Sequence, residues 1–191
     1  MSDAPQIRDW PLPYAQRLAR RDPAQVDLCV IHCTELPDLD MARSYGEREL
    51  YLDSGTGASG HYYIERGGEV TRFVDPLRSA NHTRGYNPRS IGIELINLGR
   101  YPDWYHSGRQ VMTDPYPAAQ IESLLALIAA LRVDFPALRY VAGHEDLDLA
   151  LVPASDDDAI EVRRKLDPGP MFPWAVVLER SELERFGPPE A

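Results

Sequence analysis

The hydrophobic positions of this chain form several short runs and one long helical stripe. Residues 28–32 are a continuous apolar run without strict alternation, which predicts a central strand covered on both faces. Residues 62–66 and 69–73 flank a Gly-Gly pair and predict a β-hairpin. Residues 90–97 and 139–143 predict two further strands.

The helical stripe lies at residues 117–133, where Pro117 suits the first turn of a helix. Its apolar positions recur at helical spacing: Ile121, Leu124, Leu125, Ile128 and Leu131. A second helix is predicted for residues 38–51, with Asp38 or Asp40 as its cap. Strands mixed with helices of crossover length predict an α/β fold. We expect a single domain with a mixed central β-sheet flanked by α-helices.

The segments outside these elements are mostly polar. Residues 1–26 carry four prolines and predict an extended N-terminal arm, before a domain over residues 27–180. The C-terminal tail, residues 181–191, predicts a partial helix that ends at Pro188 and Pro189. Residues 99–116 form an aromatic and polar loop of the kind that often lines binding sites, and the acidic run 156–158 predicts an exposed loop.

Charge and targeting signals narrow the function classes. The 191 residues carry a net charge of −10, which argues against nucleic-acid binding because no basic surface is available for phosphates. The same charge disfavours docking on anionic membranes or anionic wall polymers. The N-terminus has no apolar run of the signal-peptide type, and the longest apolar run, residues 124–131, is too short to span a bilayer. We expect no membrane insertion and a cytoplasmic location, although export without a signal would look the same.

The two cysteines are predicted to be free. Cys29 and Cys33 lie four positions apart in the first predicted strand, about 13 Å apart at the rise of an extended chain, which is too far for a disulfide. We expect two buried thiols, which fits a reducing compartment.

Three residues could form a metal site. His32 and His144 stand at the ends of predicted strands, and Asp167 lies in a rigid Asp-Pro-Gly-Pro turn. A catalytic zinc site needs three protein ligands and one open position. A single histidine at a strand end is more often a hydrogen-bonded core residue, and none of these spacings is a known metal motif. The occurrence of two strand-end histidines together with a downstream aspartate, rather than their spacing, indicates a metal site.

Two further residues have catalytic potential. Glu94 is a carboxylate in the middle of a predicted strand, which indicates either a structural ion pair or a general base with an adjusted pKa. Its neighbour Gly92 would leave room for substrate. Lys165 stands two positions before Asp167, so in an extended segment both side chains would face one site. An ordinary surface lysine is the alternative.

Taken in order, these segments resemble one known family, the zinc-dependent N-acetylmuramoyl-L-alanine amidases of the amidase 2 type. Phage lysozyme-like amidases and peptidoglycan recognition proteins are its relatives. The resemblance runs from about Asp27 to Trp174 and is specific because many short motifs occur together. They are Val30-Ile31-His32-Cys33-Thr34, Ser59-Gly60-His61-Tyr62-Tyr63-Ile64, Asn81-His82-Thr83-Arg84-Gly85-Tyr86-Asn87, Ser90-Ile91-Gly92-Ile93-Glu94-Leu95, Gly143-His144-Glu145-Asp146 and Lys165-Leu166-Asp167-Pro168-Gly169-Pro170.

The resemblance implies a role for each matching residue. It makes His32, His144 and Asp167 the ligands of a Zn²⁺ cofactor. Glu94 takes the place of the catalytic glutamate, and Lys165 that of the lysine near the developing oxyanion. The positions that line the substrate cleft in the family are occupied by His61 and His82. Gly60 stands where the phage branch has a catalytic tyrosine, so that role would pass to Glu94.

The implied activity is hydrolysis of the amide between the lactyl group of N-acetylmuramic acid and the L-Ala of the stem peptide. Glu94 would take and return the proton, and Arg84 could contact a stem-peptide carboxylate unless it forms a surface ion pair. The expected partners are muropeptides or polymeric peptidoglycan. The acidic surface mildly favours the soluble form, and the sequence leaves the oligomeric state open.

One departure and two alternatives accompany this reading. Asp167 follows His144 by 23 positions (144 to 167), more than is usual in the family, and the extra residues are the acidic loop at 149–161. We expect that loop to bulge outward and leave Asp167 in place. A non-catalytic muropeptide-binding module is the main alternative, and filled ligand positions argue against it. A zinc peptidase acting within the stem peptide has no support from the resemblance.

Overall fold

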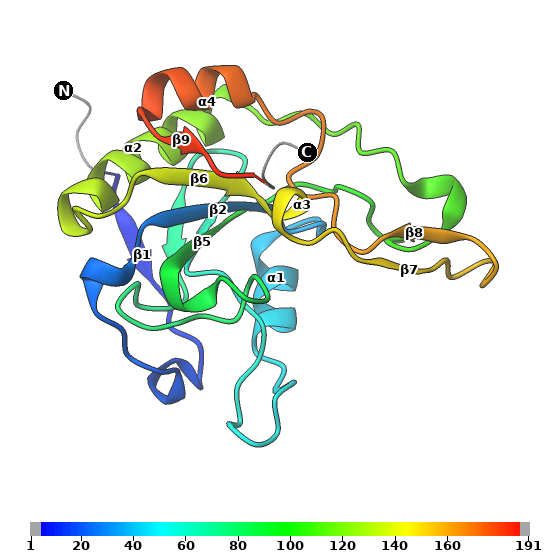
Figure 1. Ribbon diagram of the computed structural model, residues 1–191, viewed down its shortest axis with the longest axis horizontal. Coiled ribbons are helices and arrows are strands. Elements are labelled where there is room, and N and C mark those ends of the chain that lie inside the picture. The colour runs from blue at the N-terminus through cyan, green and yellow to red at the C-terminus, as the bar shows by residue number, and fades with distance from the viewer. Residues whose placement is uncertain (1–4, 188–191) are drawn as a thin grey trace.

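A mixed sheet forms the centre of the molecule in the computed structural model, which describes residues 5–187 (Figure 1). Its strand order is β1-β4-β3-β5-β2-β6-β9, and only the β3–β4 hairpin pairs antiparallel. The strands are β1 (Ile7–Asp9), β2 (Leu28–Cys33), β3 (Tyr62–Ile64), β4 (Val70–Arg72), β5 (Ser90–Leu95), β6 (Tyr140–Gly143) and β9 (Glu184–Arg185). The predicted α/β class and mixed central sheet are confirmed.

Helices cover both faces of the sheet. Helices α2 (Ala118–Asp134) and α4 (Trp174–Ser181) lie on one face, and α1 (Leu39–Gly46) lies on the other (Figure 1). The apolar stripe of α2 is buried against the strands, as its spacing predicts. A short helix α3 (His144–Leu147) follows β6. Single 3-10 turns occur at Ala15–Arg17, Pro23–Gln25, Asn87–Arg89 and Ser107–Arg109.

Helix α1 is shorter than predicted. Asp38 caps it, because its carboxylate accepts a hydrogen bond from the Met41 N–H over 2.7 Å. The helix ends at Gly46 rather than near residue 51, and the chain then turns outward as a loop (Figure 1). In that loop Leu50 and Leu52 are exposed, so no apolar face remains to hold a longer helix on the sheet.

The N-terminal segment is more than an arm laid over the domain. Strand β1 pairs in parallel with β4 and forms one edge of the central sheet. Leu12, Tyr14 and Leu18 are buried in the apolar cluster under α1. The division at residue 26 stays a prediction as a domain boundary, but the described part of this segment belongs to the sheet and to its core.

The C-terminal segment also joins the sheet. The predicted helix from Ser181 is wrong: α4 ends there, and Glu182 takes a left-handed conformation with φ 56°. Strand β9 then pairs in parallel with β6 at the other sheet edge. The predicted end at Pro188 and Pro189 lies outside the described residues.

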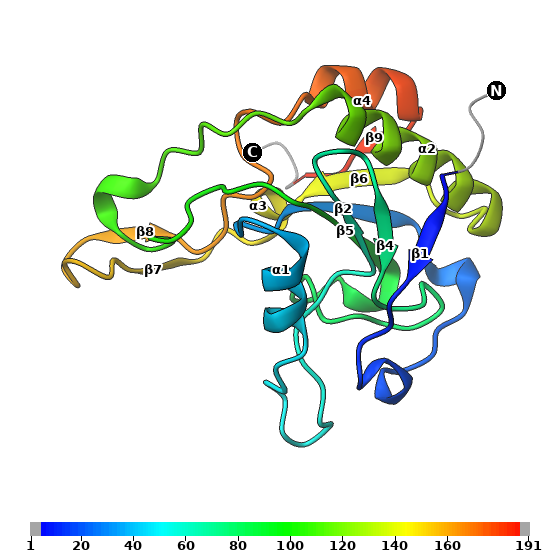
Figure 2. The ribbon, with the colours of Figure 1, turned by 180° about the vertical axis from the view of Figure 1, so that it is seen from behind.

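The extra residues between His144 and Asp167 form a second, small sheet. Strands β7 (Leu151–Pro153) and β8 (Glu161–Arg163) pair antiparallel and project from the body, with the acidic run 156–158 exposed at the turn (Figure 1). The long segment between β5 and α2 runs out beside this hairpin and returns (Figure 2). The Ser155 N–H donates to the Tyr105 carbonyl over 2.8 Å and holds the two together. The outward bulge is confirmed, although it is a hairpin rather than a loop.

Two local predictions can be compared directly with the structure. Cys29 and Cys33 are buried free thiols, as expected. Within residues 5–187, no helix has the length and apolar character that crossing a bilayer requires.

Candidate functional site

Three neighbouring parallel strands bring candidate residues to one end of the sheet. The register pairs His32 of β2 with Glu94 of β5. It also pairs Ile31 with Gly143 of β6, so that His144, the next residue, comes alongside His32. Ligands of open α/β sheets bind at the carboxyl ends of parallel strands. The candidate site lies at such an end.

Alternation along the strands decides which face these side chains occupy. The odd-numbered residues of β2 and β5 pack under α2 and α4: Cys29, Ile31, Ile91, Ile93 and Leu95. Successive side chains of a strand point to opposite faces, so His32 and Glu94 point to the face that carries α1. One face of the sheet therefore carries the main apolar core, and the other combines smaller apolar clusters with the candidate chemistry.

His32, His144 and Asp167 come together at this end. Nδ1 of His32 lies 3.0 Å and Nδ1 of His144 lies 3.2 Å from Oδ2 of Asp167. One potential ligand atom from each residue lies within 4.8 Å of the others, and all three residues are buried. The second carboxylate oxygen of Asp167, Oδ1, is buried without a hydrogen-bond partner. The predicted set is assembled despite the inserted hairpin.

The hydrogen bonds behind His32 define its tautomer. The Ser90 hydroxyl donates to the Tyr86 carbonyl over 2.8 Å, so its oxygen accepts from Nε2–H of His82 at 3.1 Å. Nδ1 of His82 is then an acceptor for Nε2–H of His32 at 3.0 Å. The Thr83 hydroxyl also lies 3.0 Å from Nδ1 of His82 and 3.4 Å from Nε2 of His32. With the proton of His32 on Nε2, its Nδ1 is unprotonated and faces the Asp167 carboxylate. Two acceptors that face each other at 3.0 Å are the arrangement that a bound cation stabilises.

The protonation states of these groups also fit a metal. Burial lowers the pKa of His32 to about 4, so the ring is neutral at pH 7. Burial would raise the pKa of Asp167, but His144 and Lys165 hold it well below its usual value. Zinc binds neutral imidazole and ionised carboxylate, usually through three protein ligands in catalytic sites. The donor set present here therefore fits Zn²⁺.

His82 lines the cavity as predicted, but the space beside Gly92 belongs to it rather than to substrate. A Cβ on Gly92 would lie 2.6 Å from Cγ of the His82 ring. Both ring nitrogens of His82 are already engaged, one with His32 and one with Ser90. Its contact with a substrate would therefore involve only the ring surface, and its main contact is with His32.

Glu94 lies next to the candidate metal centre without a fixed partner. Burial raises its pKa to about 8, Asp167 adds to this effect, and Lys165 opposes it. Within residues 5–187, no protein group forms a side-chain hydrogen bond or ion pair with Glu94. Gly60 makes the room for it, because a Cβ there would lie 2.6 Å from Cγ of Glu94. A carboxyl whose pKa lies near neutrality, without a structural partner, has the properties of a general base.

A cavity of about 450 Å³ joins the candidate residues. His32, Glu94, His144, Lys165 and Asp167 all contribute to its lining. Lys165 is half-buried and, within the described residues, has no ion pair, so its ammonium is available to a ligand.

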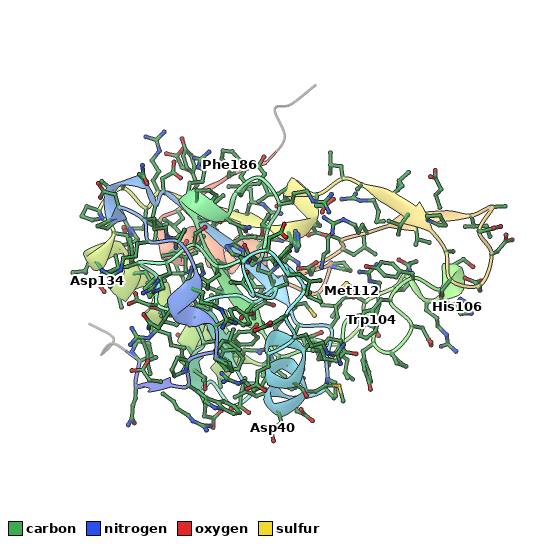
Figure 3. All side chains as sticks on the ribbon, turned by 90° about the horizontal axis from the view of Figure 1, so that it is seen from below. Asp40, Trp104, His106, Met112, Asp134 and Phe186 are labelled. Carbon is green, nitrogen blue, oxygen red and sulfur yellow. The ribbon has the colours of Figure 1, made fainter. Side chains whose placement is uncertain are left out.

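Aromatic residues also line the cavity. Tyr45 of α1 and Trp104 of the 99–116 loop pack edge to face with ring centroids 6.2 Å apart. Tyr45, Trp104 and Tyr105 all line the cavity, together with the aliphatic Leu50. Trp104 lies between α1 and the projecting hairpin, and His106 lies farther out (Figure 3). The sequence indicated that the aromatic loop lines a site, but Tyr45 was missed because its helix has an ordinary amphipathic pattern.

His61 lies outside this cavity, which corrects its prediction as a cleft residue. Its side chain is fully buried. Nδ1 accepts a hydrogen bond from the Gly92 N–H over 3.0 Å, so Nε2 donates to the Arg78 carbonyl at 2.9 Å. Burial and the nearby Arg21 lower its pKa to about 3. His61 is a neutral core residue that joins β3 to its surroundings.

Arg84 is exposed in the loop that follows His82 and is not part of the cavity lining. Within residues 5–187 it forms no ion pair, so the surface-pair alternative finds no support there. Its side chain is available to a ligand that extends beyond the cavity.

The chain matches the family model of N-acetylmuramoyl-L-alanine amidases over residues 22–170. The chain belongs to this family. A curated relative, the 1,6-anhydro-N-acetylmuramyl-L-alanine amidase AmpD of Enterobacter cloacae, is 31% identical over 121 residues. The match covers 59% of this chain and 51% of AmpD, so it spans about half the length of that relative.

Solved structures share the fold. The endolysin amidase LysCS of Clostridium intestinale has a TM-score of 0.66 at 19% identity, covering 96% of this chain and 100% of its own. AmpDh3 of Pseudomonas aeruginosa, solved in complex with anhydromuramic pentapeptide, has a TM-score of 0.60 at 26% identity. That match covers 83% of this chain and 60% of AmpDh3. The family's fold thus accounts for nearly the whole described chain.

Proposed function

We propose that this chain is a zinc-dependent N-acetylmuramoyl-L-alanine amidase. It would hydrolyse the amide bond between the lactyl group of N-acetylmuramic acid and the L-Ala of a peptidoglycan stem peptide. The observation that carries this proposal is the shared cavity of three buried metal-type ligands and Glu94, a half-buried carboxyl without a partner in the described chain. Membership of the family supports the same reaction.

His32, His144 and Asp167 would hold the zinc ion, which supplies Lewis-acid chemistry when bound. Neighbouring residues set the protonation state of one of these ligands, His32. Burial keeps the His32 ring neutral, and His82 accepts the hydrogen bond that leaves Nδ1 free to coordinate. A ligand held in this way loses little freedom when the ion binds.

Glu94 would act as general base and then as general acid. As the water oxygen bonds to the amide carbon, the Glu94 carboxylate takes a proton from that water. It then gives the proton to the leaving nitrogen of L-Ala as the carbon–nitrogen bond breaks. The products are a lactyl carboxyl group and a free amine. The Lys165 ammonium would stabilise the negative charge that develops on the carbonyl oxygen.

The substrate that we propose is a soluble anhydro-muropeptide, hydrolysed in the cytoplasm during wall recycling. Two observations on relatives support this choice. AmpD carries the 1,6-anhydro form in its name, and AmpDh3 was solved with an anhydromuramic pentapeptide. Beyond the cavity, Arg84 would contact a stem-peptide carboxylate through its guanidinium fork.

Mass spectrometry of the products tests the proposal. The protein is incubated with a soluble anhydro-muropeptide and, separately, with intact sacculi, each with and without a zinc chelator. We expect stem peptides with a free N-terminal L-Ala from the soluble substrate, lost on chelation and restored by zinc. Faster release from sacculi would move the substrate to polymeric peptidoglycan.

The same experiment decides between an enzyme and a binding module. A zinc-loaded protein that binds the muropeptide and releases nothing would be a non-catalytic module. Cleavage at a later peptide bond would instead indicate a peptidase. The Glu94→Gln protein is the matched control, since it should bind zinc and the muropeptide but release no stem peptide.

A further inference from the structure

A buried ion pair lies beside the cavity, among groups that the proposed reaction does not use. The Arg100 side chain is 1% exposed, and that of Glu35 is 8% exposed. Nε and one terminal nitrogen of Arg100 donate to the two carboxylate oxygens of Glu35 over 2.7 and 2.8 Å. The Arg100 backbone N–H donates to the same carboxylate over 3.1 Å. A bidentate, desolvated pair of this kind has a strongly defined geometry.

The terminal nitrogens of Arg100 also bind the backbone at the base of the inserted hairpin, and one of them donates in addition to Oε1 of Gln110 over 3.1 Å. One terminal nitrogen donates to the Arg163 carbonyl over 3.0 Å, and the other donates to the Arg164 carbonyl over 3.3 Å. These are the two residues directly before Lys165. The guanidinium therefore binds the chain where it leaves β8 and enters the candidate site.

Arg100 thus joins the two segments that carry the candidate ligands. Glu35 follows His32 by three residues, and Arg164 precedes Asp167 by three residues. The inserted hairpin lengthens the connection from His144 to Asp167, so that connection alone does not hold Asp167 near the sheet. The guanidinium provides a direct link between the end of β2 and the segment 163–167.

The backbone around Glu35 is shaped for this link. Glu35 itself adopts a left-handed conformation with φ 51°, which non-glycine residues rarely take. Gly99 also has a positive φ of 51°, and a Cβ there would lie 2.6 Å from Cγ of Glu35. Nε1–H of Trp104 donates to the Glu35 carbonyl over 3.0 Å. A conformation held by several independent contacts indicates a specific requirement at this position.

We propose that Arg100 is a positioning residue for the metal centre. By binding Glu35 on one side and the Arg163 and Arg164 carbonyls on the other, it sets the separation of Asp167 from His32 and the place of Lys165 in the cavity. The proposal rests on the proposed function, because it assigns Arg100 a role in the zinc site of that enzyme.

Zinc affinity is the first test, because it does not depend on turnover. Arg100→Lys keeps the charge but replaces a planar fork by a single ammonium, which cannot bind Glu35 and two carbonyls together. We expect the zinc dissociation constant, measured by competition with a chromogenic chelator, to rise about tenfold or more, as for other residues that orient ligands. We also expect kcat at saturating zinc to fall while KM changes little.

A matched control separates positioning from general stability. Arg78 is also buried and donates to the Gln16 and Leu18 carbonyls over 2.8 and 2.7 Å, away from the cavity. Arg78→Lys should lower the melting temperature of the zinc-free protein as Arg100→Lys does, yet leave zinc affinity and kcat unchanged. If the two variants shift zinc affinity equally, the role of Arg100 is only structural.

A second variant keeps the test valid if a single substitution at Arg100 prevents folding. Replacing Arg100 alone with a neutral residue would leave the Glu35 carboxylate buried and unpaired, so the double variant Glu35→Gln/Arg100→Gln removes both charges together. It should also bind zinc at least tenfold more weakly. Wild-type zinc affinity in Arg100→Lys or in the double variant would overturn the proposal. Absence of amidase activity in a wild-type protein that binds zinc would instead overturn the proposed function and leave the affinity comparison intact.

Discussion

Glu94→Gln should abolish the activity of the zinc-loaded protein but stabilise the zinc-free protein. The stabilisation should depend on pH. The glutamate has a pKa of about 8 in the folded protein, against an ordinary value of 4.5, because it is buried next to Asp167. Between these two values the folded state holds a proton that the unfolded chain has released. Stability is therefore lost as pH rises from about 4.5 to about 8. Glutamine has nearly the same shape and does not titrate, so it removes this loss.

The magnitude follows from the two pKa values. At pH 7 the carboxyl costs the folded state about 3 kcal/mol, and at pH 5 it costs less than about 1 kcal/mol. The free energy of unfolding of Glu94→Gln, relative to wild type, should therefore increase by about 2.5 kcal/mol between pH 5 and pH 7. Any difference that does not depend on pH, such as altered solvation of the amide, cancels in this comparison.

Urea unfolding at several pH values, in the presence of a chelator, measures this increase. The chelator is essential because a bound cation would stabilise the Glu94 carboxylate and reduce its cost. Glu161→Gln, an exposed glutamate of β8, is the surface control and should show no such increase. A difference between Glu94→Gln and wild type that stays constant from pH 5 to pH 7 would refute the claim that burial holds Glu94 protonated.

Three other substitutions examine neighbouring parts of the site. Gly60→Ala should lower kcat at least tenfold, because the added Cβ would displace Glu94. Its zinc content, measured by atomic absorption, should equal that of wild type. An equally active variant would contradict this geometry. Lys165→Met should lower kcat about 100-fold with little change in KM, as loss of one oxyanion donor does; a large KM increase at constant kcat would make Lys165 a binding residue instead. Arg84→Ala should raise KM for a substrate with a free stem carboxylate but not for its amidated form. Unchanged KM for both would exclude the contact.

The central strands and the ligand set could be predicted because local pattern and motif agree there. β2 and β5 are mostly apolar, and near its carboxyl end each carries one ionisable residue, His32 or Glu94, that the core does not explain. The register that places these two residues side by side follows from two neighbouring parallel strands of equal length. Where a deviation from an apolar pattern coincides with a family motif, sequence alone identifies the site.

The edge strands could not be predicted, because their residues carry no pattern of their own. β1 is Ile-Arg-Asp and β9 is Glu-Arg, and both exist only because a neighbouring strand offers backbone partners. The two histidines that were predicted to line the cleft show a different limit of sequence-based prediction. His61 and His82 occur in equally specific motifs, but only His82 lines the cavity, and His61 is fully buried behind it with the two ring centroids 5.5 Å apart. Only the three-dimensional register separates them.

Arg100 had no signal in the sequence for a related reason. An arginine in a polar loop has the composition of solvent-exposed surface, and its burial results from two segments, residues 33–36 and 163–165, that meet only in the folded chain. The hairpin insertion leaves Asp167 in place because contacts, rather than the length of the preceding loop, hold it: the Glu145 N–H donates to the Asp167 carbonyl over 2.9 Å. On our proposal, Arg100 adds the link to the end of β2. Insertions at β7–β8 should therefore matter less than substitutions at Arg100.

Two glycines, Gly60 and Gly92, make the arrangement of the candidate catalytic groups possible. At Gly60 the missing Cβ is replaced by Glu94, and at Gly92 by the His82 ring, each with 2.6 Å between the virtual Cβ and the nearest atom. The missing side chains at Gly60, just before β3, and at Gly92 of β5 therefore allow a carboxylate and an imidazole to lie against the backbone near His32. The resemblance places a tyrosine of the phage branch at position 60, and the Cβ of any such side chain would overlap Glu94 as it lies here. In this chain, a glycine at position 60 is therefore a steric requirement for a glutamate at position 94.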